Sequence, residues 1–114
     1  QPKVSDLYKK VNELNSQPLE LREWLVKNIK GYGYKEASHF MRNIGLGEGL
    51  AILDVHILRQ MTEIGLIDKG AKLTPKRYLE FERKFVELAH DLGLKPAELD
   101  IAIWLAKSGN AEIM

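Results

Sequence analysis

Apolar residues recur every three to four positions along most of the chain, which is the spacing of amphipathic helices. This pattern predicts a first helix over about residues 5–15, with Ser5 as its cap and an apolar face of Val4, Leu7, Tyr8, Val11 and Leu14. A second helix should begin at Pro18 and end before Gly31, with the inner face Leu21, Trp24, Leu25 and Ile29. A third should run from near Tyr34 to Gly45, burying Ala37, Met41 and Ile44.

The second half of the chain continues the helical pattern after a glycine-rich loop at residues 45–49. Asp54 is placed to cap a helix that ends near Gly65 and carries Ile57, Leu58, Met61 and Ile64. Thr74-Pro75 predicts the start of the longest helix, through about Leu92, and Lys95-Pro96 the start of a last one, through about Lys107. Strand patterns and repeats are lacking, so the predicted fold class is all-α.

Composition narrows the class of protein. A chain of 114 residues with 45% apolar and 29% charged residues is expected to be one helical domain, or a fragment of one, over residues 1–114. Its first residue is Gln1, which suggests a processed, trimmed or partial chain. No apolar run approaches the roughly 20 residues that span a bilayer. We therefore expect no membrane contact and an intracellular location, in the cytoplasm or nucleoid.

The chain has no cysteine and three histidines without metal-ligand spacing, so we expect neither a metal nor another cofactor. The net charge is only +1. Residues 22–42, however, hold five basic and two acidic side chains, a local charge of +3 that leaves −2 elsewhere. A basic segment on a near-neutral body favours local contact with phosphate.

A Gly-X-Gly turn, Gly31-Tyr32-Gly33, lies between the second and third predicted helices. Glycines here allow positive φ and close approach, so backbone N–H groups at the start of the third helix can bind a phosphate. The same glycines also fit an ordinary tight turn between helices. Tyr32 and Tyr34 are predicted either to pack on a sugar–phosphate backbone or to cover the core.

Lys35 follows this turn directly, and Asp54 lies nineteen positions further on in Leu53-Asp54-Val55-His56. An amine beside a phosphate-binding turn can attack a sugar carbon as a nucleophile. Most lysines are instead solvated surface groups, and an aspartate at a helix start is usually only a cap. A capping carboxylate stays ionised, so Asp54 can cap the helix and also stabilise positive charge on a sugar.

The two motifs Lys-Glu-Ala-Ser-His, at residues 35–39, and Ile-Leu-Asp-X-His, at residues 52–56, carry a family resemblance. The chain resembles the helix-hairpin-helix DNA glycosylases that are also abasic-site lyases, and most closely the archaeal-type 8-oxoguanine DNA glycosylase/lyase group. The helix-hairpin-helix would span about residues 19–44. The chain corresponds to the C-terminal part of a family member and would lack the N-terminal helices. Its last residues, Glu112-Ile113-Met114, differ from the lysine-ending tail of that group.

The resemblance implies a bifunctional repair enzyme that acts on double-stranded DNA containing oxidised guanine or abasic sites. It assigns Lys35 as the nucleophile that forms a Schiff base and cleaves the strand by β-elimination, and Asp54 as the assisting carboxylate. It implies DNA contacts by Gly31, Gly33, Tyr32, Tyr34, His56 and His39. Trp104 is either a core residue, as its spacing with Ile101, Ile103 and Leu105 suggests, or a contact of the damaged base.

Two other functions remain open. A non-catalytic helix-hairpin-helix module would explain the glycines and the local charge, although not Lys35 and Asp54 at this spacing. A helical protein-interaction domain would not bind duplex DNA in a salt-sensitive way.

Overall fold

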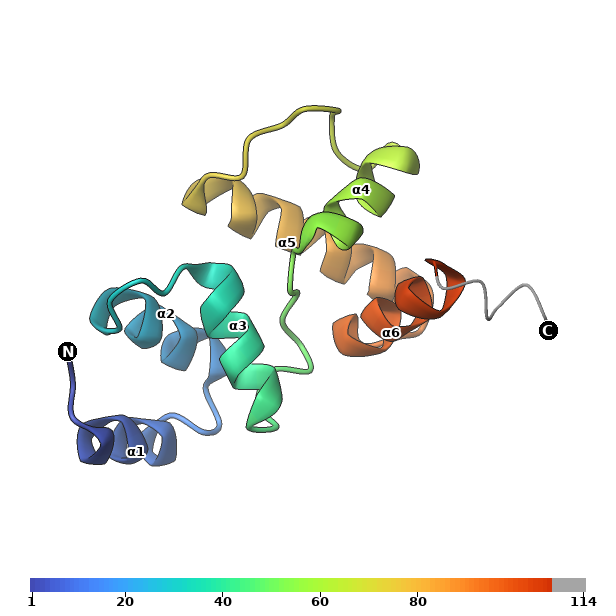
Figure 1. Cartoon of the computed structure of the whole chain (residues 1–114). Helices are drawn as coiled ribbons and strands as arrows, with labels where there is room; N and C mark the ends of the chain where they lie inside the picture. The colour runs from blue at the N-terminus through green and yellow to red at the C-terminus, as the bar shows by residue number, and fades with distance from the viewer. Residues whose placement is uncertain (108–114) are drawn as a thin grey trace. The chain divides into compact units, whose positions relative to one another are not determined.

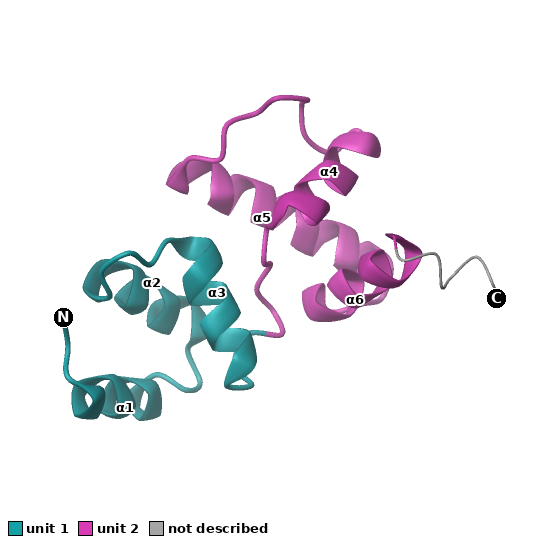
Figure 2. Ribbon diagram, in the orientation of Figure 1, with its two compact units in different colours: residues 1–47 teal, residues 48–114 magenta. Residues whose placement is uncertain are grey.

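The computed structural model describes residues 1–107, and residues 108–114, with the Glu112-Ile113-Met114 end, lie outside the described part. Six helices and no strands form residues 1–107, so the all-α prediction is confirmed. The chain divides into two compact units, residues 1–47 and residues 48–114 (Figures 1 and 2). Each unit has its own buried apolar residues.

The first unit contains α1 (Val4–Glu13), α2 (Pro18–Asn28) and α3 (Tyr34–Asn43). α2 packs against α3 through fully buried side chains on both helices, which are Leu21, Leu25, Ala37 and Met41. Gly31 joins the two helices with φ +85°, a conformation that favours glycine. The sequence predicted both helix starts, at Pro18 and at Tyr34.

The cap of α1 differs from the prediction. The helix begins at Val4 with Lys3 at its cap position, and Ser5 lies inside the first turn. The Lys3 N–H donates to the Asp6 carboxylate at 3.3 Å, so a side chain in the first turn accepts from the N–H of the cap residue. An acidic side chain three residues into the helix therefore sets this boundary.

The second unit contains α4 (Val55–Glu63), α5 (Pro75–Asp91) and α6 (Pro96–Lys107). α6 packs against both α4 and α5. Thr74 caps α5 through a 3.2 Å hydrogen bond from Arg77 N–H, as its place before Pro75 predicted. The core of this unit combines the extended stretch before α4 with the three helices, through Leu53, Ile57, Met61, Phe81, Phe85, Ala89 and Leu99.

Several apolar residues at helical spacing, among them Ile44 that was predicted to be buried, are exposed. Ile44 and Ile64 are 40% and 51% exposed, and each lies one residue past the end of its helix. The backbone leaves the helical path there, so the 3.6-residue period no longer predicts which side a residue faces. On α6, the outer residues Ile101, Trp104 and Leu105 are exposed, and only the side carrying Leu99 is buried.

The loop at residues 45–49 needs glycine for two different reasons. Gly45 ends α3 with φ +82°. Gly47 is buried against the end of α3, and a Cβ there would lie 2.5 Å from the backbone nitrogen of Arg42. Gly47 therefore allows the chain to turn back closely on α3 as it leaves the first unit. Within residues 1–107, no helix combines the length and apolar character that crossing a membrane requires.

Candidate functional site

The hairpin between α2 and α3 shows how Gly31 and Gly33 shape the start of α3. Gly31 uses positive φ, as predicted, and the Tyr32 N–H donates to Ile29 O at 3.1 Å. Gly33 has φ −94°, so of the two properties that the sequence allows at these glycines it uses close approach and not positive φ. Its N–H instead donates to Glu36 Oε1 at 3.0 Å, and a Cβ on Gly33 would lie 3.1 Å from that same oxygen. The bare α-carbon permits close approach of the carboxylate.

This contact bears on phosphate binding at the hairpin. The first helical hydrogen bond of α3 runs from Ala37 N–H to Gly33 O at 3.0 Å, so the N–H groups of the turn before Ala37 have no acceptor within the helix. They carry the partial positive charge of the helix N-terminus. The Glu36 carboxylate already occupies the Gly33 amide. An incoming phosphate would therefore bind the amides that follow Gly33 or displace Glu36.

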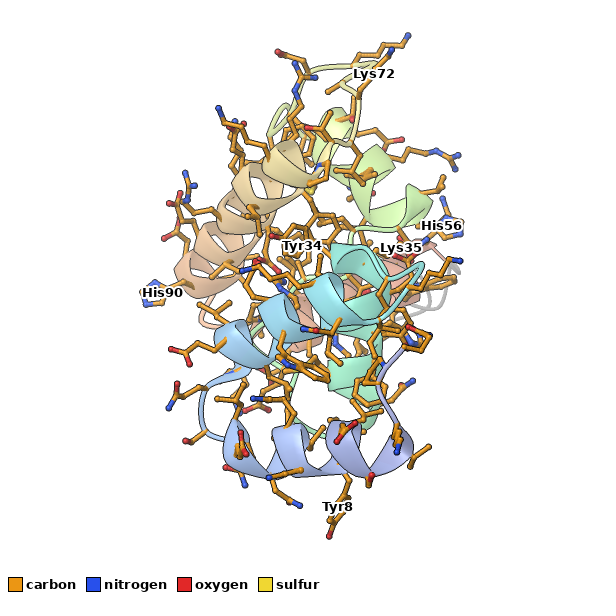
Figure 3. The ribbon with its side chains drawn as sticks, turned by 90° about the vertical axis from the view of Figure 1, so that its left-hand side faces the viewer. Tyr8, Tyr34, Lys35, His56, Lys72 and His90 are labelled. Atoms are coloured by element: carbon orange, nitrogen blue, oxygen red, sulfur yellow. The ribbon has the colours of Figure 1, made fainter. Side chains whose placement is uncertain are left out.

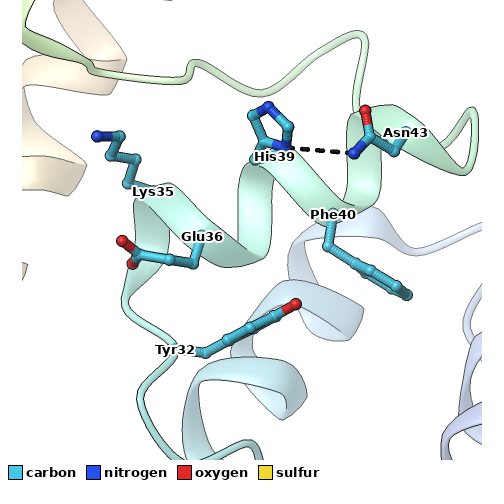
Figure 4. Close-up of a pocket in the computed structure, with 6 residues that line it drawn as sticks. All are labelled: Tyr32, Lys35, Glu36, His39, Phe40 and Asn43. Atoms are coloured by element: carbon cyan, nitrogen blue, oxygen red, sulfur yellow. Dashed lines mark hydrogen bonds between the residues drawn. The ribbon is translucent and has the colours of Figure 1, made fainter.

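Lys35 lies in the first turn of α3 and is exposed. It lines an open cavity of about 310 Å³ together with Tyr32, Glu36, His39, Phe40 and Asn43. Lys35, His39 and Asn43 follow one side of the helix at intervals of four residues (Figure 4). Asn43 Nδ2 donates to His39 Nδ1 at 3.2 Å, which orients the imidazole along this row. The structure thus brings together three of the predicted residues, Lys35, His39 and Tyr32.

Tyr34 has a different environment from Tyr32. Its hydroxyl donates to Glu23 Oε1 on α2 at 2.6 Å, and its ring lies 5.2 Å from the Arg22 guanidinium. Arg22 is only 2% exposed and donates to Ser38 Oγ on α3 at 3.0 Å. These contacts turn Tyr34 toward α2, in line with the alternative that it covers the core. Its contact with DNA stays a prediction.

Asp54 is the N-cap of α4, as predicted. Its Oδ1 accepts a 2.9 Å hydrogen bond from Ile57 N–H, and its carbonyl accepts from Leu58 N–H at 2.9 Å. Among the described residues, Oδ2 of Asp54 has no hydrogen-bond partner. The half-buried carboxylate is therefore held through one of its two oxygens.

His56 and Trp104 lie together in the second unit. Their ring centroids are 4.9 Å apart with an interplanar angle of 65°, an edge-to-face contact between α4 and α6. Trp104 is 47% exposed, so its indole is accessible to solvent and Trp104 is not a core residue. Nδ1 of His56 is buried without a hydrogen-bond partner in the described part of the chain. The structure therefore gives His56 an aromatic contact with Trp104.

Sequence reasoning missed several polar residues around these sites. Glu36, three positions after Gly33, had the spacing of a capping box and was detectable from that signal. Buried Arg22 and the pair Tyr78 and Glu82 on α5 depend on contacts between distant segments, and nothing local in the sequence indicates them. Within residues 1–107, no group of three or more His, Asp or Glu side chains could hold a metal ion.

Comparisons with known proteins identify the family of this chain. A family model described as 8-oxoguanine DNA glycosylase matches residues 2–94. The 8-oxoguanine DNA glycosylase/AP lyase of Fusobacterium nucleatum is 50% identical over 79% of this chain and 42% of its own length. The protein of the same name from Aquifex aeolicus is 47% identical over 94% of this chain and 47% of its own.

Two solved structures share the fold. The crystal structure of the Methanocaldococcus jannaschii 8-oxoguanine DNA glycosylase superimposes with a TM-score of 0.75 at 41% identity, covering 87% of this chain and 48% of that one. The Thermotoga maritima 8-oxoguanine DNA glycosylase gives a TM-score of 0.70 at 39% identity, covering 89% and 52%. The chain therefore spans about half the length of the relatives it matches.

Two helices joined by a Gly-X-Gly hairpin, with a lysine in the first turn of the second helix, define a helix-hairpin-helix protein. Since the family model covers most of its length, the chain belongs to the 8-oxoguanine DNA glycosylase family. The resemblance found in the two sequence motifs is confirmed. The half-length match agrees with the prediction that the chain corresponds to the C-terminal part of a family member.

Proposed function

We propose that the chain carries the reacting residues of a DNA glycosylase/AP lyase that removes 8-oxoguanine and cleaves the strand through a Schiff base on Lys35. The observation that carries this proposal is the place of Lys35. It is exposed, it lies in the first turn of the helix after the hairpin, and it lines a cavity beside N–H groups suited to phosphate. Binding of a backbone phosphate there would bring a sugar carbon within reach of the amine.

The chemistry requires one amine and one carboxylate. Unprotonated Lys35 Nζ attacks C1′ of the damaged nucleotide, the bond from C1′ to the base nitrogen breaks, and the base leaves with a proton. Opening of the sugar ring gives a Schiff base between Nζ and C1′. The iminium acidifies the C2′ proton, and loss of that proton expels the 3′ phosphate by β-elimination. The Asp54 carboxylate, held by its capping hydrogen bond from Ile57 N–H, stabilises the positive charge that develops on the sugar.

The other predicted residues would hold the substrate. The hairpin amides at Gly33 and beyond, with Tyr32, His39 and His56, contact the phosphates of duplex DNA. Trp104 offers an exposed aromatic face for a base turned out of the helix. The duplex substrates would contain oxidised guanine or an abasic site.

Because the chain spans about half the length of its relatives, base excision and strand cleavage should be retained to different extents. Excision requires a pocket that encloses the flipped base, whereas Schiff-base formation at an open abasic site needs mainly the lysine and carboxylate. We expect cleavage of abasic DNA to exceed excision of 8-oxoguanine. Equal loss of both activities in a folded chain would contradict this expectation.

The test is borohydride trapping on duplexes that contain either an abasic site or 8-oxoguanine. The variant Lys35→Gln should lose the covalent adduct. Lys76→Gln is a matched control, because Lys76 is also the second residue of its helix. Adduct formation by Lys76→Gln but not by Lys35→Gln would support the lyase. Salt-sensitive DNA binding with no adduct in any variant would instead favour a non-catalytic helix-hairpin-helix module.

A further inference from the structure

The segment that leads into Asp54 is buried although it belongs to no helix or sheet. Leu50, Ala51 and Leu53 are at most 3% exposed, and residues 51–54 have no regular secondary structure. Backbone N–H and C=O groups in such a segment lack the partners that a helix or sheet provides. Side chains from elsewhere in the unit must therefore satisfy them.

Two side chains of α5 supply these partners. The Tyr78 hydroxyl donates to Ala51 O at 2.6 Å and accepts from Leu53 N–H at 3.2 Å. Glu82 Oε2 accepts from Ala51 N–H at 2.9 Å. Tyr78 and Glu82 are four residues apart and so lie on the same face of α5. Together they bind both backbone groups of Ala51 and the N–H of Leu53.

The burial of these two groups makes the contacts specific. Tyr78 is 3% exposed and Glu82 is 8% exposed. A carboxylate removed from water is costly unless hydrogen bonds compensate it, and a buried backbone group left unpaired is costly as well. The segment can therefore shift along α5 only by breaking several buried hydrogen bonds at once.

We propose that Tyr78 and Glu82 are positioning residues for Asp54. After Asp54 the chain is fixed by the first turn of α4, and before it the chain is fixed by the contacts of residues 51–53 with α5. The direction in which the carboxylate leaves the backbone depends on both. This inference rests on the proposed role of Asp54 in the reaction at the sugar, and it adds two residues that touch neither DNA nor the reacting atoms.

The magnitude follows from how strongly catalysis depends on placement. A displacement of about 1 Å in a reacting group, caused by a change remote from the chemistry, can lower a rate by about a hundredfold. We expect Tyr78→Phe, which removes the hydroxyl that contacts Ala51 O and Leu53 N–H, to slow strand cleavage by about tenfold to a hundredfold. Affinity for DNA should stay near the wild-type value, because the hairpin amides proposed to bind phosphate lie in the other unit and the substitution leaves His56 and Trp104 in place.

The experiment measures single-turnover cleavage of an abasic-site duplex by the full 114-residue chain. The dissociation constant is measured on a duplex carrying a tetrahydrofuran abasic analogue, which cannot form a Schiff base. Tyr8→Phe is the matched control, because Tyr8 is exposed and points away from α1 into solvent (Figure 3). Slower cleavage by Tyr78→Phe, with unchanged affinity and a control equal to wild type, is the expected result.

Glu82 offers a second pair of variants that keeps the proposal testable if Tyr78→Phe does not fold. Glu82→Gln retains an oxygen that can accept from Ala51 N–H, and it should cleave at nearly the wild-type rate. Glu82→Met has a similar length but no comparable acceptor, and it should be slow. Equal rates for folded Gln and Met variants would overturn the proposal.

A double-mutant cycle separates positioning from a general loss of structure. In an Asp54→Asn background, Tyr78→Phe should cause no further decrease in rate, since the carboxylate it positions is already absent. An undiminished effect in that background would show that Tyr78 acts elsewhere and would overturn the inference. If Asp54→Asn alone leaves the rate unchanged, Asp54 takes no part in the reaction. The proposed positioning role of Tyr78 and Glu82 is then also refuted.

Discussion

Asp54 has two proposed tasks, and a series of three substitutions separates them. Its Oδ1 caps α4 by accepting from Ile57 N–H at 2.9 Å, while Oδ2 is open to act on a sugar. Asn and Ser keep a side-chain oxygen that can cap the helix, but they lack the charge. Ala lacks both. Asp54→Asn, Asp54→Ser and Asp54→Ala should therefore differ in stability but agree in their loss of activity.

The expected magnitudes follow from these contacts. Replacing a capping residue by Ala costs about 0.5–2 kcal/mol, and about 1 kcal/mol lowers Tm by roughly 4–8 °C in a domain of 60–100 residues. Asn and Ser lose only the interaction of the charge with the helix N-terminus, about 0.3–1 kcal/mol. Removing a group that stabilises developing charge lowers the rate by about 10²–10³, and all three variants should show this decrease.

Thermal unfolding followed by circular dichroism gives the Tm, and single-turnover cleavage of an abasic-site duplex gives the rate. We expect the Asn and Ser variants to melt between wild type and Ala, with cleavage slowed to the same extent in all three. If Asn and Ser are as unstable as Ala, the side-chain oxygen does not cap α4 in solution. If Asp54→Asn cleaves at the wild-type rate, the carboxylate takes no part in the reaction.

Three further predictions concern the glycines and the hairpin. Gly47→Ala should destabilise the chain by about 1–3 kcal/mol in urea unfolding, because the new Cβ would clash with the backbone of Arg42. Gly49→Ala is the control and should have little effect, because no atom lies within 4 Å of a Cβ at Gly49. Gly31→Ala should lower the free energy of unfolding by roughly 1–2 kcal/mol in the same assay, because the alanine would have to adopt φ +85°. An unchanged free energy of unfolding would show that the hairpin relaxes to another conformation. Glu36→Ala frees the Gly33 amide, so it should tighten binding to undamaged duplex DNA severalfold at low salt, and by more than Glu36→Gln does. Equal affinities of the variants and wild type would show that the carboxylate does not compete with phosphate.

Helix boundaries were largely predictable because the signals that set them are local. Pro18, Thr74-Pro75 and Lys95-Pro96 mark helix starts within one or two residues, and glycines follow the ends of α2, α3, α4 and α5. The failures were also local in origin. Ser5 does not cap α1, because the helix begins before it at the Lys3–Asp6 contact. Apolar residues just past a helix end do not continue the buried face of the helix, as their spacing suggested.

The candidate site was predictable to the same extent. Lys35 and Asp54 belong to short motifs, and the structure gives each the helix-terminal position that the sequence indicated. Burial on α6 was not predictable, because the apolar spacing of Ile101, Trp104 and Leu105 does not say whether another segment covers them. The turn of Tyr34 toward Glu23 and Arg22 depends on how α2 packs on α3, which no local pattern specifies.

The two proposed reacting groups are held in physically different ways. Lys35 extends from a helix that begins at a hairpin, and the features described at that start are local, namely the positive φ of Gly31 and the contact of Glu36 with Gly33. Asp54 follows a segment with no regular structure, whose backbone depends on side chains that lie 25 to 31 residues further along the chain. A motif can therefore identify both groups, but only the tertiary structure can show what holds the carboxylate in place. Substitutions far from Asp54 in sequence should for this reason affect the proposed reaction more than substitutions of its exposed neighbours.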